Sequence, residues 1–228
     1  MTLLAEDLLL LVLDDETGAQ TLDGTRTDLA LGGALLLELA LAGRVALTRD
    51  GPWWAREQVG VTDPAPLGDA LLDEALVTVA EKPRGSQELV GRLGKGVRAR
   101  LLERLQARGV LERRSDTVLG LFPRTRWPTA DSRHEEQVRA RLRDVLLVGL
   151  APDQRTGALT ALLVAVDKAH AVLPGLSREE RRAVKVRARA VAEGAWAAEA
   201  VSAAVAAMQA AVMAGTVAAT TAATASSG

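Results

Sequence analysis

The 228-residue chain contains no cysteine, no tyrosine and a single phenylalanine, and aromatic residues make up only 2% of it. Without thiols it can form no disulfide, no cysteine nucleophile and no thiolate metal site, and a reducing compartment fits this composition. Hydrophobic residues still amount to 48%, and most of them are Leu, Val and Ala. Such a core suits helix packing better than a β-sandwich. We therefore expect a mainly α-helical fold with a substantial core.

Recognised catalytic motifs are also missing. The glycine-rich run 91–96 differs in spacing from a phosphate-binding loop, and no Ser or Thr follows Lys95. The two histidines, His134 and His170, share no metal-ligand spacing. We expect His134 on a solvated helix start and His170 near a helix end, where a cation would complement the helix dipole. The prediction is a protein that is not an enzyme and needs no cofactor and no metal.

No targeting or membrane-spanning segment is evident either. The first apolar run, 8–13, follows Glu6 and Asp7, which carry the wrong charge for a signal peptide. The Ala-rich run 195–214 is only weakly apolar and contains Glu199, so a buried helix is expected there. The preference for Arg over Lys and the many Ala residues are typical of a GC-rich bacterial genome. We expect a cytoplasmic bacterial protein.

The net charge of −1 hides an uneven distribution. Residues 1–80 carry 4 basic and 14 acidic side chains, whereas residues 81–150 carry 16 and 9. This split favours one basic surface that meets phosphates or an acidic partner. Two complementary surfaces inside one fold would give the same pattern, so both interpretations stay open.

Hydrophobic periodicity and capping residues predict a single helical domain with small β-hairpins. Helices are expected as a short segment after a Thr2 cap and over 29–41, 67–79, 86–93, 97–108, 133–147, 153–172, 178–192 and 195–214. One hairpin is expected over 44–61, and a second in which 110–112 pair with 118–122 around the turn 113–117. The domain is expected to span 1–215, with a flexible Ala/Thr/Ser tail over 216–228.

The basic residues of the middle segment gather on and after the expected helix 97–108. They are Lys95, Arg98, Arg100, Arg104, Arg108, Arg113 and Arg114. Gly94 and Gly96 leave the N–H groups at the start of this helix exposed, so these groups and Lys95 can hold a phosphate. We predict a phosphate or lipid-headgroup site at Lys95, Arg98 and Arg100. A solvated, Arg-rich helix face is the alternative.

The few aromatic side chains lie with other large apolar residues at the expected hairpins. These residues are Trp53 and Trp54 in the first hairpin and Leu119, Leu121 and Phe122 in the second. If exposed, they would suit contact with a membrane interface or with another subunit, and a homo-oligomer through the second hairpin is one expectation. The alternative is that these residues are buried against the core.

A second class of function fits the same segment. A helix over 97–108 followed by an Arg-tipped hairpin is typical of a winged-helix module that binds nucleic acid. Against this, the chain is not basic overall, and its acidic first third would oppose a duplex.

Several motifs together resemble those of the Golgi phosphoprotein 3 family. They are residues 3–11 (LLAEDLLLL), 36–44 (LLELALAGR), 68–76 (GDALLDEAL) and 108–111 (RGVL). The resemblance implies a helical domain with a protruding hairpin for membrane contact or oligomerisation. It also implies binding of phosphatidylinositol 4-phosphate in a basic pocket; eukaryotic relatives in addition recognise glycosyltransferase tails and coatomer.

The pocket residues of the family carry over only in part. Two basic positions correspond to Lys95 and Arg98, but Asp23 stands where the eukaryotic pocket has Trp, and Gly32 stands where it has a further Arg. The resemblance thus implies a phosphoinositide-binding, cytoplasmic adaptor that sits peripherally on the inner face of the membrane. A protein client of such an adaptor is possible but is not specified by the sequence.

Overall fold

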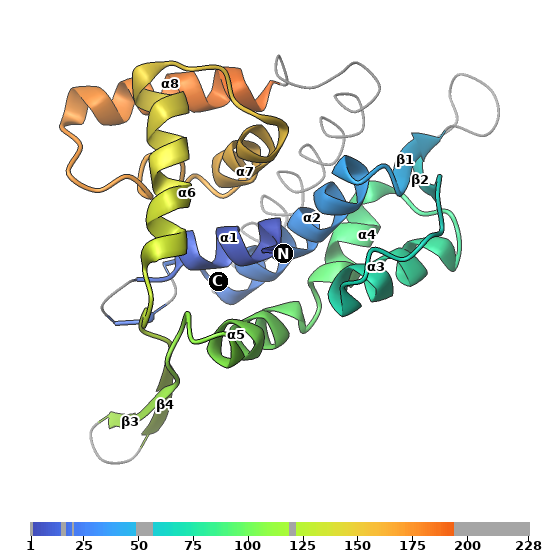
Figure 1. Cartoon of the computed structure of the whole chain (residues 1–228), viewed down its shortest axis with the longest axis horizontal. Helices are drawn as coiled ribbons and strands as arrows, with labels where there is room; N and C mark the ends of the chain where they lie inside the picture. The colour runs from blue at the N-terminus through green and yellow to red at the C-terminus, as the bar shows by residue number, and fades with distance from the viewer. Residues whose placement is uncertain (1, 15–16, 20, 49–56, 119–121, 194–228) are drawn as a thin grey trace, which may run out of the picture.

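The structure is a computed structural model that describes residues 2–14, 17–19, 21–48, 57–118 and 122–193 (Figure 1). It is mainly helical, with two antiparallel strand pairs, as the sequence predicts. The elements follow in the order α1 (Leu4–Val12), α2 (Gly24–Leu41), β1 (Val45–Thr48), β2 (Gln58–Val61), α3 (Ala70–Ala80), α4 (Ser86–Gly94), α5 (Val97–Ala107), β3 (Arg114–Val118), β4 (Phe122–Arg126), α6 (Arg133–Arg143), the π-helix η1 (Asp144–Val148), α7 (Gln154–Ala165) and α8 (Arg178–Ala192).

The longest helix of the described residues, α2, runs through the middle of the molecule and contacts α1, α3, α4, α5 and α7 (Figure 1). It begins at Gly24, five residues before the expected start at 29, because the Asp23 side chain caps it by accepting a hydrogen bond from the Arg26 N–H at 2.9 Å. Its second half is almost wholly buried. This central position makes α2 the scaffold on which the other helices are placed.

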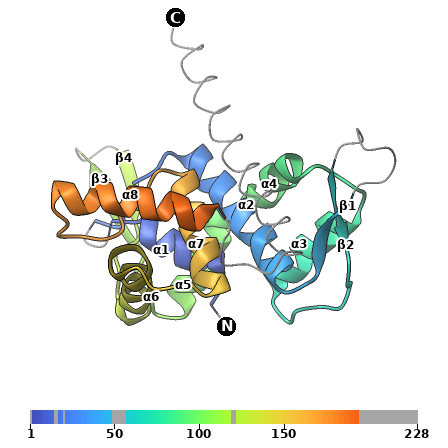
Figure 2. The same ribbon diagram turned by 90° about the horizontal axis from the view of Figure 1, so that it is seen from above.

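All nine residues of α1 are buried, including the carboxylates of Glu6 and Asp7. The expected cap at Thr2 is wrong, since the N-cap residue is Leu3, whose N–H donates to the Glu6 carboxylate at 2.8 Å. A helix with so many apolar residues belongs in the interior of a protein, where its two carboxylates need partners. Figure 2, which views the molecule from above, shows α1 enclosed between α5, α6 and α7.

The expected hairpin over 44–61 is confirmed, with β1 pairing antiparallel to β2 from Val45↔Val61 to Thr48↔Gln58. It lies beside α3 and the end of α2, at one end of the molecule (Figure 1).

The second hairpin has a different register from the expected one. The segment 113–117, predicted as its turn, is mostly strand β3, and the ladder runs from Arg114↔Arg126 to Val118↔Phe122. The physical reason is that the base of the hairpin is fixed farther along the chain, by a bridge between Leu111 and Thr129. The hairpin protrudes from the helical body (Figure 1), but Arg114, a residue of the expected turn, pairs with Arg126 at the base of the ladder.

The C-terminal half packs α6, η1, α7 and α8 against one another. Helix α8 begins at Arg178 as predicted, because Ser177 and Glu180 form a reciprocal capping box. Helix α7 ends at Ala165, seven residues before the predicted end, because Asp167 adopts a left-handed conformation with φ of 53°. The expected helix 195–214 and the tail 216–228 lie outside the described residues.

Candidate functional site

The turn between α4 and α5 consists of Lys95 and Gly96. Gly96 adopts a left-handed conformation with φ of 75° and forms the N-cap of α5, and no side chain caps that helix. The first N–H groups of an uncapped helix carry partial positive charge and attract anions. Lys95 therefore lies directly beside an electropositive helix start, as the sequence predicts.

This turn is held against α2 by two glycines. A Cβ atom on Gly32 would lie 2.1 Å from the Val90 carbonyl oxygen and 2.6 Å from the Gly94 nitrogen. A Cβ atom on Gly94 would lie 2.1 Å from the Asp28 carbonyl oxygen. Only glycine at both positions allows such close backbone packing. The position of Lys95 relative to α2 is consequently fixed by the backbone itself.

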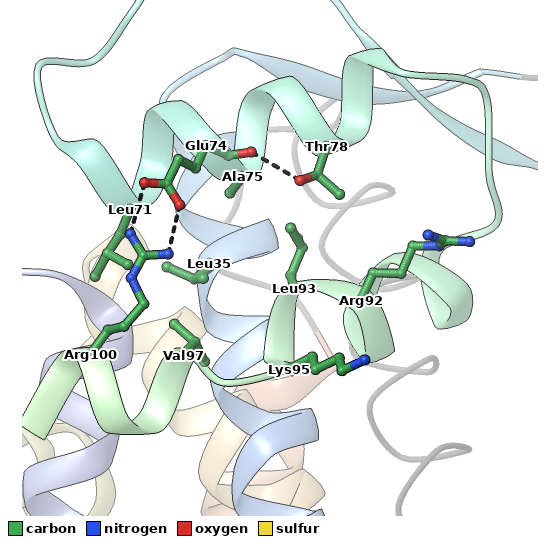
Figure 3. Close-up of a pocket in the computed structure, with 10 residues that line it drawn as sticks. All are labelled: Leu35, Leu71, Glu74, Ala75, Thr78, Arg92, Leu93, Lys95, Val97 and Arg100. Carbon is green, nitrogen blue, oxygen red and sulfur yellow. Dashed lines mark hydrogen bonds and ion pairs between the residues drawn. The ribbon is translucent and has the colours of Figure 1, made fainter.

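Lys95 lines a hollow of about 170 Å³ between α3 and the α4–α5 turn. Apolar and polar side chains both line it; they are Leu35, Leu71, Glu74, Ala75, Thr78, Arg92, Leu93, Lys95, Val97 and Arg100. Figure 3 shows that the Lys95 side chain extends away from Arg100. Among the described residues the Lys95 side chain has no hydrogen-bond or ion-pair partner, so its ammonium group can bind an external anion.

Arg100 lines the same hollow but already has an anionic partner. Its guanidinium donates to both carboxylate oxygens of Glu74, at 2.6 and 2.8 Å, across the hollow (Figure 3). This hydrogen bond raises the pKa of Arg100 and lowers that of Glu74. A carboxylate that accepts two hydrogen bonds from a guanidinium uses the same donors that a phosphate would. Arg100 can therefore meet an external phosphate only if Glu74 releases it.

Arg98 lies on the other side, against the first turns of α2. Its Nε atom is 3.4 Å from the Asp28 carboxylate, and one of its terminal nitrogens would lie 3.2 Å from a Cβ atom on Gly24. Burial raises the pKa of Asp28, and Arg98 partly offsets that effect. Thus the structure brings Lys95 and Arg100 to one hollow and places Arg98 outside the set of residues that line it.

Two further arginines, one in α5 and one at its C-cap, are held by acidic partners. Arg104 and Arg108 both pair with the buried carboxylate of Glu6, at 3.0 and 2.9 Å, and Arg104 also pairs with Asp69. A recognition helix needs such side chains on its outer face to reach phosphates and bases. The sequence does not reveal these pairs, because the acidic partners come from distant segments. The geometry of α5 gives no support to the nucleic-acid interpretation.

A family model described as Golgi phosphoprotein 3 matches residues 4–208 of the chain. The chain belongs to this family. It is similar to a vacuolar protein sorting-associated protein 74 of Eremothecium gossypii, with 29% identity over 168 residues, which are 63% of this chain and 49% of the relative. The chain thus spans about half the length of the curated relative that it matches.

Two positions that the resemblance assigns to the headgroup pocket, Asp23 and Gly32, lie at the start and in the middle of α2. Asp23 caps α2, close to the turn on which Arg98 rests. Gly32 faces the backbone of α4 with no room for a side chain. An arginine at that position would need a different spacing of α2 and α4. The described site therefore has fewer cations than the resemblance alone implies.

Of the residues predicted to contact a membrane or another subunit, one lies within a described strand. Trp53, Trp54, Leu119 and Leu121 lie outside the described residues. Phe122 begins β4 and pairs with Val118 across the ladder. Their predicted role in membrane or subunit contact stays a prediction.

The two histidines occupy different surroundings from those expected. His134 is not on a solvated face, since its Nε2 atom lies 2.6 Å from the Asp7 carboxylate in a partly buried pair. His170 lies shortly after the end of α7, as expected, but burial lowers its pKa, which disfavours the charged form there. In the part of the chain that the structure describes, no cluster of three His, Cys, Asp or Glu side chains could hold a metal ion. No helix within the same described ranges is long and apolar enough to cross a membrane.

Proposed function

We propose that this Golgi phosphoprotein 3 family member is a peripheral membrane adaptor that binds the phosphorylated headgroup of an anionic phospholipid at the α4–α5 turn. The observation that carries the proposal is Lys95, which lacks a partner among the described residues and lies beside the uncapped start of α5. Arg98, three residues later, supplies a second cation on the α2 side.

The headgroup that fits best is a phosphomonoester such as that of phosphatidylinositol 4-phosphate, which the family resemblance implies. A helix start and a flexible ammonium group both favour a compact, doubly charged phosphate. The proposed location is the cytoplasmic side of a membrane, where anionic lipids attract basic residues. We also propose a bacterial host, which the preference for Arg over Lys and the many Ala residues favour. From the resemblance we further propose a protein client and a homo-oligomer through the second hairpin.

Vesicle co-sedimentation tests the proposal. Phosphatidylcholine vesicles with phosphatidylinositol 4-phosphate are compared with vesicles that contain unphosphorylated phosphatidylinositol. We expect the Lys95→Ala/Arg98→Ala variant to bind the phosphorylated vesicles about tenfold or more weakly, since each basic residue at a membrane surface contributes about 1 kcal/mol. Binding of the wild-type chain should weaken as salt rises.

The matched control is Lys82→Ala/Arg178→Ala, which removes two exposed cations elsewhere. It should bind nearly as the wild-type chain does. Equal losses in both variants would mean that net charge alone drives binding, and no loss in Lys95→Ala/Arg98→Ala would exclude the turn as the site. Sequence-selective duplex binding that this variant loses would favour the nucleic-acid regulator instead.

A further inference from the structure

A second hollow lies on a different part of the molecule, between the end of α7 and helix α8. It has a volume of about 280 Å³ and is lined by Val164, Asp167, Ala169, His170, Lys185, Ala188 and Arg189. Helices α7 and α8 lie side by side (Figure 1). None of these residues lines the hollow at Lys95, so the second hollow is independent of the proposed headgroup site.

The mouth of this hollow is shaped by the way α7 ends. The N–H groups of Asp167 and Lys168 donate back to the Val164 and Leu163 carbonyls, at 3.0 and 2.8 Å, and close the helix. Asp167 takes the left-handed position of this closure, with φ of 53°, where glycine is the usual residue. Its exposed carboxylate then lies 3.5 Å from the Lys185 ammonium.

His170 lines this hollow. Among the described residues, its Nδ1 atom is buried and has no hydrogen-bond partner. The Nε2 atom is not in that situation. A proton on Nδ1 would be a buried donor with no acceptor, which is unfavourable. We therefore assign the proton of the neutral ring to Nε2, where it can be donated outward.

The charges around His170 are mostly positive. Burial is the largest cause that lowers the pKa of His170, and the positive charge of Lys185 is the second. Arg181 and Lys168 also lower this pKa, whereas Asp167 raises it. Arg189 lies one helical turn after Lys185 and has no partner among the described residues. Lys185 and Arg189 are thus neighbours on one face of α8, and Asp167 is the one carboxylate among the described residues that line the hollow.

We propose that this hollow binds a phosphate monoester, with Lys185, Arg189 and the Nε2–H group of His170 as donors. Two cations and one neutral donor match a compact dianion, and a guanidinium pairs with phosphate in a bidentate manner. The remaining walls, formed by Val164, Ala169 and Ala188, offer apolar contact to the organic part of the ester. Asp167 competes with the ligand for Lys185.

The chain contains two histidines, which allows a direct test by nuclear magnetic resonance. The full chain, labelled with ¹⁵N in its histidine rings, is titrated with inorganic phosphate and then with glycerol 3-phosphate at fixed pH and ionic strength. We expect a saturable shift of the His170 resonances, with His134 as the internal reference. Absence of a saturable His170 shift with both ligands would overturn the proposal.

Two double variants serve as controls for each other, because each removes two cations. Lys185→Ala/Arg189→Ala should weaken phosphate binding at His170 by about tenfold or more, since each charge-assisted contact is strong. Lys95→Ala/Arg98→Ala should leave it unchanged. The reverse pattern would assign phosphate binding to the α4–α5 turn and refute this site, whereas the proposed function is tested separately by the vesicle experiment on that turn.

The Asp167→Gly variant tests the site in a chain that is expected to stay folded. It removes the competing carboxylate and places glycine at the left-handed position, so the chain should stay folded. It should bind phosphate about two- to fivefold more tightly, as expected when a surface ion pair no longer competes. Weaker or unchanged binding in a folded Asp167→Gly chain would contradict the proposed geometry.

The source of the phosphate is distinguished with phosphatidylcholine vesicles that contain phosphatidic acid. Vesicle binding that Lys185→Ala/Arg189→Ala loses, and that glycerol 3-phosphate competes away, identifies a lipid headgroup as the ligand. A His170 shift with glycerol 3-phosphate but no vesicle dependence on Lys185 and Arg189 identifies a soluble phosphate ester. Both outcomes support a phosphate monoester site.

Discussion

The guanidinium of Arg155 donates to the Glu38 carboxylate at 2.7 Å, although 117 positions separate the two residues. The same guanidinium donates to Asp7 at 2.9 Å and to the Thr2 carbonyl oxygen at 2.7 Å. Glu38 also accepts a short hydrogen bond from the Leu4 N–H. Burial raises the pKa of Glu38, and Arg155 offsets much of that effect. Arg155 therefore joins α1, α2 and α7 in the core.

Replacement of Arg155 by alanine should destabilise the fold strongly. It leaves Asp7 and Glu38, which are 4% and 5% exposed, without their cation. Breaking a buried ion pair in this way costs about 3–5 kcal/mol, so the urea midpoint should fall clearly. The control is Arg100→Ala, which loses an exposed pair and should change the midpoint little. Equal midpoints for the two variants would contradict the importance of the network.

Acid should destabilise the protein partly through His170. Its pKa in the folded state lies below the ordinary value of 6.5, because of burial and the nearby cations Lys185, Arg181 and Lys168, against Asp167. The unfolded chain therefore binds more protons near neutral pH, and this contribution to stability is complete above 6.5 and is lost as pH falls. We expect the free energy of unfolding to decrease from pH 7.5 to about 5.5.

The same measurement on His170→Gln separates this histidine from His134. The variant should show a smaller decrease over the same pH range, because glutamine does not titrate. An identical pH dependence in both chains would show that His170 is not the group responsible.

Glycine at position 32 is predicted to be required for the contact of α2 with α4. Gly32→Ala places a Cβ atom 2.1 Å from the Val90 carbonyl oxygen, and overpacking of this kind costs about 1–3 kcal/mol or more. The matched control is Gly91→Ala in α4, where no atom lies within 4 Å of the added Cβ. Gly91→Ala should be neutral or stabilise by up to about 1 kcal/mol through helix propensity. Thermal unfolding of both variants is the measurement.

Release of Arg100 should strengthen headgroup binding. Glu74→Gln removes the carboxylate that holds Arg100 in the hollow beside Lys95, so that Arg100 can meet an external phosphate. We expect vesicles with phosphatidylinositol 4-phosphate to bind about two- to threefold more tightly, a gain typical of one exposed ion pair. Glu103→Gln, an exposed carboxylate on α5, makes the same change in net charge and should have a smaller effect. If both variants gain equally, net charge and not Arg100 is responsible.

Local signals in the sequence predict many elements of the fold well. Helix α8 is predicted from Arg178 to Ala192 because its capping box and periodicity both lie within the helix. The end of α7 is missed because the apolar run continues past Ala165, and no glycine or proline marks the break. There a non-glycine residue, Asp167, adopts the left-handed conformation, which the sequence pattern does not indicate.

At the candidate site, the sequence shows that basic residues cluster, but it does not show which of them pair with acidic residues of other helices. Periodicity places Lys95, Arg98 and Arg100 on and beside one helix. It cannot show that Arg100 meets Glu74 of α3 or that Arg98 meets Asp28 of α2. These partners are set by how helices pack, and the close contact at Gly32 decides that packing.

The burial of Asp7 has a consequence for the order of folding during synthesis. Its partner Arg155 lies 148 positions farther along the chain. Domains fold as units as they emerge from the ribosome, and contacts between distant residues form late because the intervening loop must first be closed. Helix α1 is synthesised before α7, so its native surroundings are complete only once α7 has been made. Until then, Asp7 lacks the cation that neutralises it in the folded protein.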